Sequence, residues 1–352
     1  MTLAMKRSGT TTSGKPSIRD IAREAGVSIT TVSHALNDKG RLPQATRDRV
    51  RELADRLGYV ADPKGRGLAT GRTMLLAIHA SGFGSPVLVP EAAYFVQLIN
   101  GAAQAASRLG YGLVLAPPST SAEEIHRLAA DGAIIVDPTG KEALLENLHA
   151  ARSPLVTTGR TPGSQHDDPW VDNDHVAAAT LALEHLADIG CERPALLTTT
   201  IAPSYVIDAV RGYRAWCKTR GVEPRIARVR GMPNPDRARR VAGRMLDQPS
   251  PPDALYATLD LLATGALEAA DERGIAVPHE LALVTTTDSA VVSTARPSVT
   301  ALDLKPDRIG ARAIELLVGL VEDQPIAERH VLIPVELQLR ASTDRRAGGA
   351  TR

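Results

Sequence analysis

The stretch "IAREAGVSITTVSHALN", residues 21–37, concentrates short side chains that form hydrogen bonds. Between positions 28 and 34 it holds four hydroxyls and one imidazole, on Ser28, Thr30, Thr31, Ser33 and His34. Such groups suit the edges of bases and the oxygens of phosphates, and the first residues of an α-helix in the major groove meet both. The chemistry that this pattern indicates is recognition of DNA rather than the breaking of bonds.

Three short helices are predicted to position these side chains. Ser17 with Asp20 three residues later is typical of a helix start, and Gly26 is a stop signal. The first helix should bury Ile21, Ala22 and Ala25.

The second helix should begin after Ser28, which can cap it, and should bury Val32 and Ala35 or Leu36. Its outward side then carries Ile29, Thr30, Ser33 and His34. A third helix is predicted from about Gln44 to Leu57, with a buried stripe at Val50, Leu53, Ala54 and Leu57. Together they predict a helix-turn-helix module, and the alternative is a three-helix bundle for protein contacts.

The charge distribution favours the DNA-binding interpretation. The whole chain carries +1, but residues 1–73 hold 14 Lys and Arg against 7 Asp and Glu. That is +7 for this part, which leaves −6 for the rest. The basic excess therefore lies with the three helices.

Length and composition set the frame. At 352 residues, with 43% hydrophobic and 23% charged side chains, two or more domains are expected. The sequence shows no run of eighteen apolar residues and no secretory signal, so no membrane partner is expected. Only Cys191 and Cys217 are present, which fits a reducing compartment. We therefore expect a cytoplasmic, nucleoid-associated protein.

Residues 57–73, "LGYVADPKGRGLATGRT", join the helices to the next domain and surround one apolar side chain, Leu68, with glycines and basic residues. Together with "SIRDIAREAGVSITTVSHALN" this segment resembles, without a gap from Ser17 to Thr73, the DNA-binding headpiece and hinge of the lactose/galactose repressor (LacI/GalR) family. The Ala-Gly-Val-Ser, Thr-Val-Ser and Asn core of the motif makes the resemblance specific.

The resemblance implies roles for individual residues. Base readers would be Ile29, Thr30 and His34, and phosphate contacts Ser17, Ser28, Thr31, Ser33 and Asn37. Leu68, flanked by Arg66 and Ala69, would be the minor-groove wedge of the hinge. The family commonly has Arg in place of His34 and helix formers in place of Gly65 and Gly67. These departures predict a different operator sequence and a hinge helix that is weak in isolation.

From Met74 the pattern changes to apolar strands alternating with helices. Strands are predicted at 74–79, 111–116, 132–136, 154–158, 194–199, 254–258 and 281–286, with more within 330–343. This indicates two doubly wound parallel-sheet subdomains with a ligand cleft beyond the carboxyl ends of their strands. Segments such as "VDNDHVAAATLALEHLADIGCERPALLT" extend the resemblance to the family's periplasmic-binding-protein-like core.

The expected organisation follows from these boundaries. Residues 1–16 would be a disordered basic arm, 17–62 the helix-turn-helix domain, 63–73 the hinge, 74–343 the effector-binding and dimerisation domain, and 344–352 a tail. Crossovers between the subdomains are expected near 158–172, 286–302 and 325–330. The chain end lacks a leucine heptad, so we expect a homodimer on a pseudo-palindromic operator in double-stranded DNA.

Six residues are candidates for binding the effector: Tyr94, Phe95, Arg160, Trp170, Asp208 and Asp288. The alternatives are a core position for Phe95, surface positions for Arg160 and Trp170, and helix capping for Asp288. Three polar residues common in the family are replaced here by Ala209, Thr287 and Leu259, which predicts an altered polar set around a sugar-like ligand.

Enzymatic function is not expected. The chain has no Walker A motif, no G-x-S-x-G elbow, no H-E-x-x-H and no Cys-x-x-Cys, and its nine histidines are scattered. His175 and His185 are expected at the surface or core edge, so no metal or cofactor is predicted. The sequence predicts a transcriptional repressor controlled by a small molecule; the alternative is a cytoplasmic solute-binding protein without a regulatory role.

Overall fold

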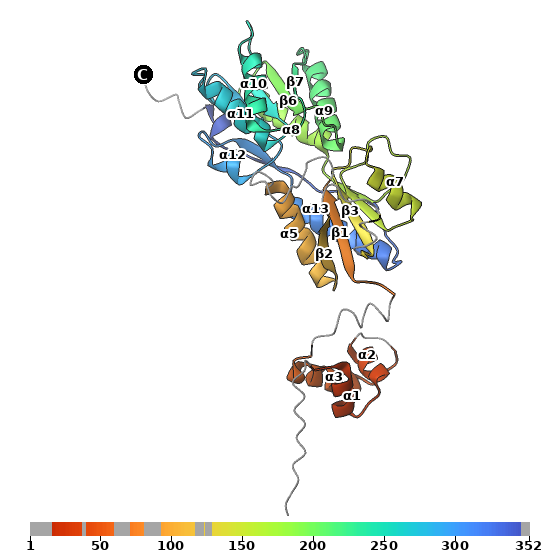
Figure 1. The fold of residues 1–352 in the computed structure, drawn as a ribbon. Helices are drawn as coiled ribbons and strands as arrows, with labels where there is room; N and C mark the ends of the chain where they lie inside the picture. The colour runs from red at the N-terminus through yellow and green to blue at the C-terminus, as the bar shows by residue number, and fades with distance from the viewer. Residues whose placement is uncertain are drawn as a thin grey trace, which may run out of the picture. The chain divides into compact units, whose positions relative to one another are not determined.

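The computed structural model describes residues 16–36, 40–59, 71–80, 93–116, 123 and 129–345. The chain divides into one unit up to Thr73 and a second from Met74 (Figure 1). The predicted DNA contact Asn37 lies outside the described residues, as do the hinge residues Arg66, Leu68 and Ala69. The arm up to residue 15 and the tail from residue 346 also lie outside them.

Among its described residues the first unit has three helices: α1 Ile18–Ala25, α2 Ile29–Leu36 and α3 Gln44–Leu57. The Asp20 carboxylate accepts hydrogen bonds from the Ser17 backbone N–H at 2.9 Å and the Ser17 hydroxyl at 2.6 Å. Gly26 ends α1 in the left-handed conformation, at φ 65°. The predicted three-helix module is confirmed.

The helices enclose one small core, in which Ile21, Val32, Ala35 and Val50 are fully buried. Polar contacts tie the helices together at its rim. Arg56 on α3 pairs with Glu24 on α1 at 2.6 Å, and the Arg49 guanidinium donates to the Ala25 carbonyl at the end of α1. The core buries one side of α2, at Val32 and Ala35, and leaves Ile29 and Thr30 exposed to solvent.

The second unit contains two six-stranded sheets. The first, sheet A, is parallel throughout, and its strands in spatial order are β11 His330–Leu332, β5 Trp170–Asp172, β4 Leu155–Thr158, β3 Gly132–Val136, β1 Leu75–Ala80 and β2 Gly112–Ala116. Its helices are α5 Ala93–Arg108, α7 Ala143–Ala150 and α13 Pro306–Val321.

The second sheet, sheet B, is parallel except for its edge strand β12, which runs antiparallel to β10. Its order is β12 Glu336–Gln338, β10 Thr300–Asp303, β9 Ala282–Thr285, β8 Ala254–Ala257, β6 Pro194–Thr199 and β7 Ile226–Val229. Its helices are α8 His175–Asp188, α9 Ser204–Arg220, α10 Pro235–Leu246, α11 Asp260–Asp271 and α12 Ala290–Thr294, with a 3-10 turn at Ala341–Thr343. The predicted two-subdomain α/β class is confirmed.

The expected crossovers were placed too early. Residues 170–172 and 300–303 form β5 and β10, each still paired within its own sheet, and residues 330–332 form β11 of sheet A. The chain passes between the sheets at 173–174, 304–305 and 333–335. The sequence analysis missed β5, β7 and β10, which are short and each include a charged residue, Asp172, Arg228 and Asp303, that interrupts the apolar run.

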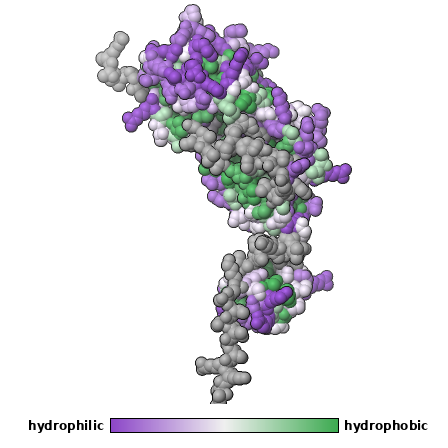
Figure 2. All heavy atoms as spheres, in the orientation of Figure 1, coloured by the Kyte–Doolittle hydropathy of each residue, from purple (hydrophilic) through white to green (hydrophobic). Residues whose placement is uncertain are grey.

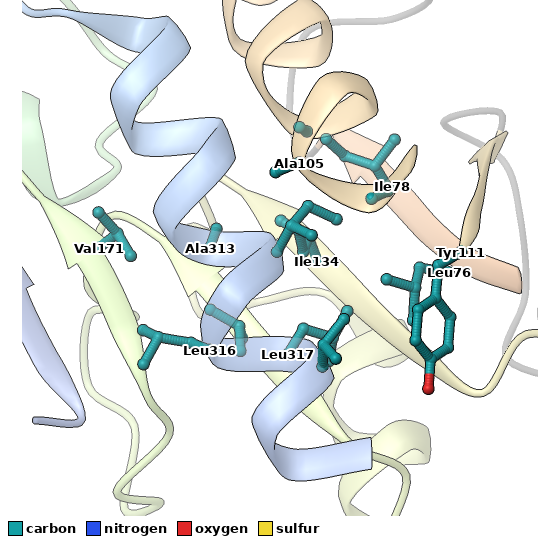
Figure 3. Close-up of a cluster of buried hydrophobic side chains, with 14 of the residues drawn as sticks. Leu76, Ile78, Ala105, Tyr111, Ile134, Val171, Ala313, Leu316 and Leu317 are labelled. Atoms are coloured by element: carbon teal, nitrogen blue, oxygen red, sulfur yellow. The ribbon is translucent and has the colours of Figure 1, made fainter. Parts of the chain in front are cut away.

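The core of the first subdomain lies between sheet A and the helix pair α5 and α13. Figure 3 shows Leu76, Ile78 and Ile134 of the strands meeting Ala313 and Leu317 of α13. Although α5 and α13 are about two hundred residues apart, they pack closely along their lengths. The C-terminal helix therefore belongs to the N-terminal sheet.

Two glycines permit this close packing, and one of them supports a prediction. A Cβ on Gly310 would lie 2.0 Å from the Leu98 carbonyl oxygen, and one on Gly101 would lie 2.0 Å from that of Asp307. Gly310→Ala is expected to lower the free energy of unfolding by about 1–3 kcal/mol or more, because the backbone at Leu98 must move away from the new methyl group. The control is Gly319→Ala in the same helix, where the nearest atom lies at 3.5 Å. Urea unfolding in which the two variants match would contradict this interpretation.

Candidate DNA-reading helix and ligand cleft

The outward side of α2 carries the predicted DNA-reading residues. Ile29 is 46% exposed, and Ser28 and Thr30 are also exposed. The Ser28 hydroxyl accepts a hydrogen bond from the Thr31 backbone N–H at 3.0 Å, so the predicted cap of α2 is present. The first turn thus presents an apolar side chain and hydroxyls to solvent.

His34 is less free than Thr30. A Cβ on Gly40 would lie 2.8 Å from His34 Nδ1, so the imidazole rests against the loop after α2. Arg47 donates to the carbonyls of Gly40 at 2.7 Å and His34 at 3.4 Å. The role of His34 in reading bases stays a prediction, with Thr30 and Ile29 better placed for it.

Ser17 is already engaged within the headpiece. Its N–H and its hydroxyl both donate to Asp20, and a phosphate would have to compete with that carboxylate for the same donors. The Ser28 hydroxyl is likewise engaged, with the hydroxyl of Thr31 at 2.8 Å, and Thr31 and Ser33 are half-buried on α2. The phosphate contacts stay predictions.

In the second unit, polar side chains gather where the parallel strands of both sheets end. Five of them have a buried polar atom without a hydrogen-bond partner among the described residues: Thr158, Thr161, His175, Thr285 and Ser289. A buried polar atom without a partner costs about 1–3 kcal/mol, and proteins rarely leave several together. These atoms make this end of the strands the candidate ligand site.

A charged cluster spans the two subdomains at this place. Arg160, which follows β4 of sheet A, contacts the buried Asp208 carboxylate of α9, and its Nε lies 3.5 Å from Asp172 Oδ2 at the end of β5. The Ser204 hydroxyl donates to Asp172 at 3.3 Å, and His175 Nε2 lies 3.2 Å from the same carboxylate. Ion pairs and hydrogen bonds therefore connect sheet A with the first turns of α8 and α9.

The environment of Asp172 keeps it ionised. Burial raises its pKa, but the hydrogen bond and charge of His175, the Asn173 N–H and the Arg160 charge outweigh burial, so its pKa is lowered overall. Asp172 is therefore a hydrogen-bond acceptor at neutral pH.

Asp137, directly after β3, behaves in the opposite way. Burial, followed by repulsion from Asp172, raises the pKa of Asp137 to about 8 from 3.8. The same two carboxylates and, above all, burial raise the pKa of Tyr94 well above its ordinary value. Around neutral pH the cleft thus combines the donors Asp137 and Tyr94 with ionised acceptors, which is the pattern that a hydroxyl-rich ligand requires.

The raised pKa of Asp137 predicts how stability depends on pH. The folded protein keeps a proton that the unfolded chain releases above about pH 4, so this group penalises folding increasingly from about pH 4 to about pH 8. The slope is at most about 1.4 kcal/mol per pH unit. Asp137→Asn should remove this penalty, whereas Asp167→Asn, at a side chain 75% exposed, should retain it. Urea unfolding across that pH range measures both, and equal slopes for Asp137→Asn and the natural chain would contradict the assignment.

A pocket of about 310 Å³ lies between α5 and the residues that follow β9 and end β10 in sheet B. Tyr94 and Gln97 line it from α5, and Asp288 with Arg340 lines it from the second subdomain. Arg340 donates to Asp288 at 2.8 Å. Since this ion pair occupies Asp288 and Ser289 is the N-cap of α12, helix capping is not the role of Asp288.

The six effector candidates thus fall into three places. Arg160 and Asp208 lie in the charged cluster, with the Trp170 ring 5.9 Å from the Arg160 guanidinium. Tyr94 and Asp288 line the pocket. Phe95 packs edge to face on Tyr94, 5.8 Å between ring centres, and against the core of the first subdomain.

The sequence analysis missed several residues of this cluster: Asp137, Asp172, Ser204, His175 and Tyr205, whose ring centre lies 5.8 Å from that of His175. Each ends a strand, directly follows one or lies in the first turn of a helix, and that position is the signal that would have found them. His175 is indeed at the core edge, and His185 is half-buried and hydrogen-bonds Thr343 at 2.9 Å.

Across the ranges that the structure describes, no group of three or more His, Cys, Asp or Glu is arranged to hold a metal ion. Within the same ranges, no helix has the length and apolar character needed to cross a membrane.

Residues 17–62 match the family described as bacterial regulatory proteins, lacI family, and residues 183–343 match the periplasmic binding protein-like domain. Catabolite control protein A of Priestia megaterium is 27% identical over 93% of this chain and 98% of its own length. The regulator AglR of Rhizobium meliloti is 29% identical over 93% and 94%.

Solved structures share the fold. A lac repressor dimer bound to operator and the anti-inducer ONPF has a TM-score of 0.73 at 22% identity, covering 94% of this chain and 99% of its own. A complex of the transcriptional regulator CelR with cellobiose has a TM-score of 0.69 at 24% identity, covering 93% and 99%.

Proposed function

Because the chain belongs to the lacI family of bacterial regulatory proteins, we propose that it is a transcriptional repressor that binds one operator through α2. A small polar ligand would lower or raise its affinity for that operator. The observation that carries this proposal is the exposed first turn of α2, with Ile29 and Thr30 facing solvent over a complete three-helix core. A helix so presented can enter a major groove without unfolding the module behind it.

The operator is proposed to be a pseudo-palindrome. The lac repressor structure of similar fold is a dimer bound to operator, and two headpieces of a symmetric dimer read two half-sites. Within each half-site, Ile29, Thr30 and His34 would read bases. Phosphate contacts are proposed for Ser17, Ser28, Thr31, Ser33 and Asn37. Leu68, between Arg66 and Ala69, would enter the minor groove.

The ligand is proposed to be sugar-like. Unpartnered hydroxyls at strand ends, protonated Asp137 and ionised Asp172 offer both donors and acceptors. A structure of the regulator CelR, which has a similar fold, contains cellobiose. A relative from Vibrio atlanticus that is 26% identical is named the transcriptional repressor PurR. Arg160 and Asp208 are proposed to supply the polar contacts that Ala209 and Leu259 cannot make.

A solute-binding protein without a regulatory role is the less favoured function, because such a protein would not need α2 and its exposed hydroxyls. The relatives of this chain include named regulators of transcription. We therefore propose that the chain has no catalytic activity and a cytoplasmic location on the nucleoid.

Selection of genomic DNA fragments by the full chain tests the proposal. A repressor should enrich a few fragments that share one pseudo-palindromic motif, and purified duplexes with scrambled half-sites should bind at least about 10³-fold more weakly. Uniform recovery of all fragments would show that the chain binds DNA without reading it.

A further inference from the structure

One edge of the second subdomain is unusually basic. Residues 211–244 hold eleven Lys and Arg and only two acidic residues, Glu223 and Asp236, in a chain whose total charge is +1. This segment forms the second half of α9, the edge strand β7 and nearly all of α10. Figure 2 shows strongly hydrophilic side chains over the end of the core that holds α10 and β7.

Seven exposed cations of this segment have no carboxylate partner among the described residues, and one of them, Arg237, donates instead to the Met232 carbonyl at 2.8 Å. The other six are the ones of interest. They are Arg214 and Lys218 on α9, Arg228 and Arg230 at β7, and Arg240 and Arg244 on α10. We call these six residues the arginine edge. Neighbouring cations do have partners: Arg220 pairs with Glu184, and Arg239 pairs with Asp236, Glu268 and Glu272. Arg225 and Arg237 donate to backbone carbonyls instead, of Ser250 and Met232. The arginine edge is what remains when cations with carboxylate or carbonyl partners are set aside.

Protection of an open sheet edge explains only part of this charge. β7 pairs with β6 alone, and charged side chains on an edge strand discourage pairing with other chains. That accounts for Arg228 and Arg230. It does not account for the helices on either side, where Arg214 with Lys218 and Arg240 with Arg244 are each spaced by one helical turn on solvent-facing sides.

We propose that the arginine edge is a second DNA contact, which binds the phosphates of duplex DNA without selecting bases. Like charges four residues apart on a helix repel each other, so an arrangement of unpaired cations is stabilised when a polyanion approaches. Guanidinium groups match phosphate oxygens in geometry, and phosphate contacts supply affinity without sequence preference.

An acidic protein partner fits this surface less well. Stable protein interfaces centre on buried aromatic or aliphatic anchors, and cations are depleted from their centres. Within 211–244 the aromatic side chains Tyr213 and Trp216 are buried, and Met232 alone among the large apolar residues of the segment is prominently exposed, at 42%. The surface offers charge without an anchor, which favours a nucleic acid.

The test uses the full chain with three charges reversed: Arg214→Glu, Arg228→Glu and Arg240→Glu. The matched control reverses Lys141→Glu, Arg152→Glu and Arg308→Glu, three exposed cations outside the arginine edge. Both variants keep the natural headpiece and change the net charge equally. Any difference in their DNA affinity therefore comes from where the reversed charges lie. Melting curves check folding, and Arg→Gln variants at the same three positions replace any reversal that unfolds.

Affinity for a duplex without operator is measured against salt concentration. We expect the arginine-edge variant to bind at least about tenfold more weakly than the control at low salt, with a log–log salt slope smaller by about 0.9 for each phosphate that the variant no longer binds. Equal affinities and slopes for the two variants would overturn the proposal. Unchanged duplex binding together with abolished binding to polyglutamate would overturn it in favour of an acidic protein. Operator selection through α2 stands or fails independently of this result.

Discussion

Replacing Ile29 and Thr30 together by alanine is expected to lower operator affinity by about 100-fold or more. Both side chains face solvent from the first turn of α2, and neither supports the headpiece core. Each good base contact contributes about 1–3 kcal/mol of discrimination, so removing two should also flatten the preference for particular bases. A titration of the full chain with operator and with scrambled duplex measures both effects.

The control for this prediction is Ser33→Ala, at a proposed phosphate contact. Removing a phosphate contact should weaken operator and scrambled duplex alike, because phosphates carry no sequence. Melting of each variant confirms that the headpiece is folded. If the alanine pair at 29 and 30 retained full preference for the operator, the first turn of α2 would not be the reading surface.

Replacing Arg160 by leucine is expected to destabilise the core by about 3 kcal/mol and to abolish the response to ligand. The change leaves the carboxylates of Asp172 and Asp208, each 5% exposed, without the cation between them. Breaking a buried ion pair costs about 3–5 kcal/mol, and the lower end applies because Arg160 is 38% exposed. The change also removes one link between the subdomains, because Arg160 joins the end of β4 to α9.

The matched control is Arg329→Leu, which breaks a pair between Arg329 and Asp167 with exposed fractions of 44% and 75%. An exposed pair contributes at most about 1 kcal/mol. Urea unfolding and ligand titration of both variants separate the two sites. Equal stabilities for Arg160→Leu and Arg329→Leu would show that the charged cluster of the cleft does not hold the subdomains together.

The sequence predicted those features that depend on local patterns. The capping pair Ser17 and Asp20, the stop at Gly26 and the buried stripe of α3 lie within a few residues of one another, and all three appear in the structure. Strands with long apolar runs, such as 132–136 and 194–199, were also found at their true bounds.

Features that depend on distant residues were missed. Asp137 and Asp172 look like ordinary acidic residues after strands, and only the meeting of β3 with β5 through β4 places them close enough for one to raise the pKa of the other. Likewise, Arg160 and Asp208 are both predicted as effector contacts, but the sequence contains no signal that they contact each other across the subdomains. The strands β5, β7 and β10 were missed for a related reason, because pairing with their neighbours rather than an apolar run of their own defines them.

The central claim is that ligand binding in the cleft and operator binding by α2 are coupled. A thermal-shift screen of sugars, nucleosides and purines on the full chain identifies a ligand, and operator affinity is then titrated with and without it. If the sites are coupled, the ligand changes operator affinity by some factor, commonly about 5–150-fold, and the operator changes ligand affinity by the same factor. A ligand that stabilises the protein, loses affinity when Arg160 is replaced, and yet leaves operator affinity unchanged would contradict the account.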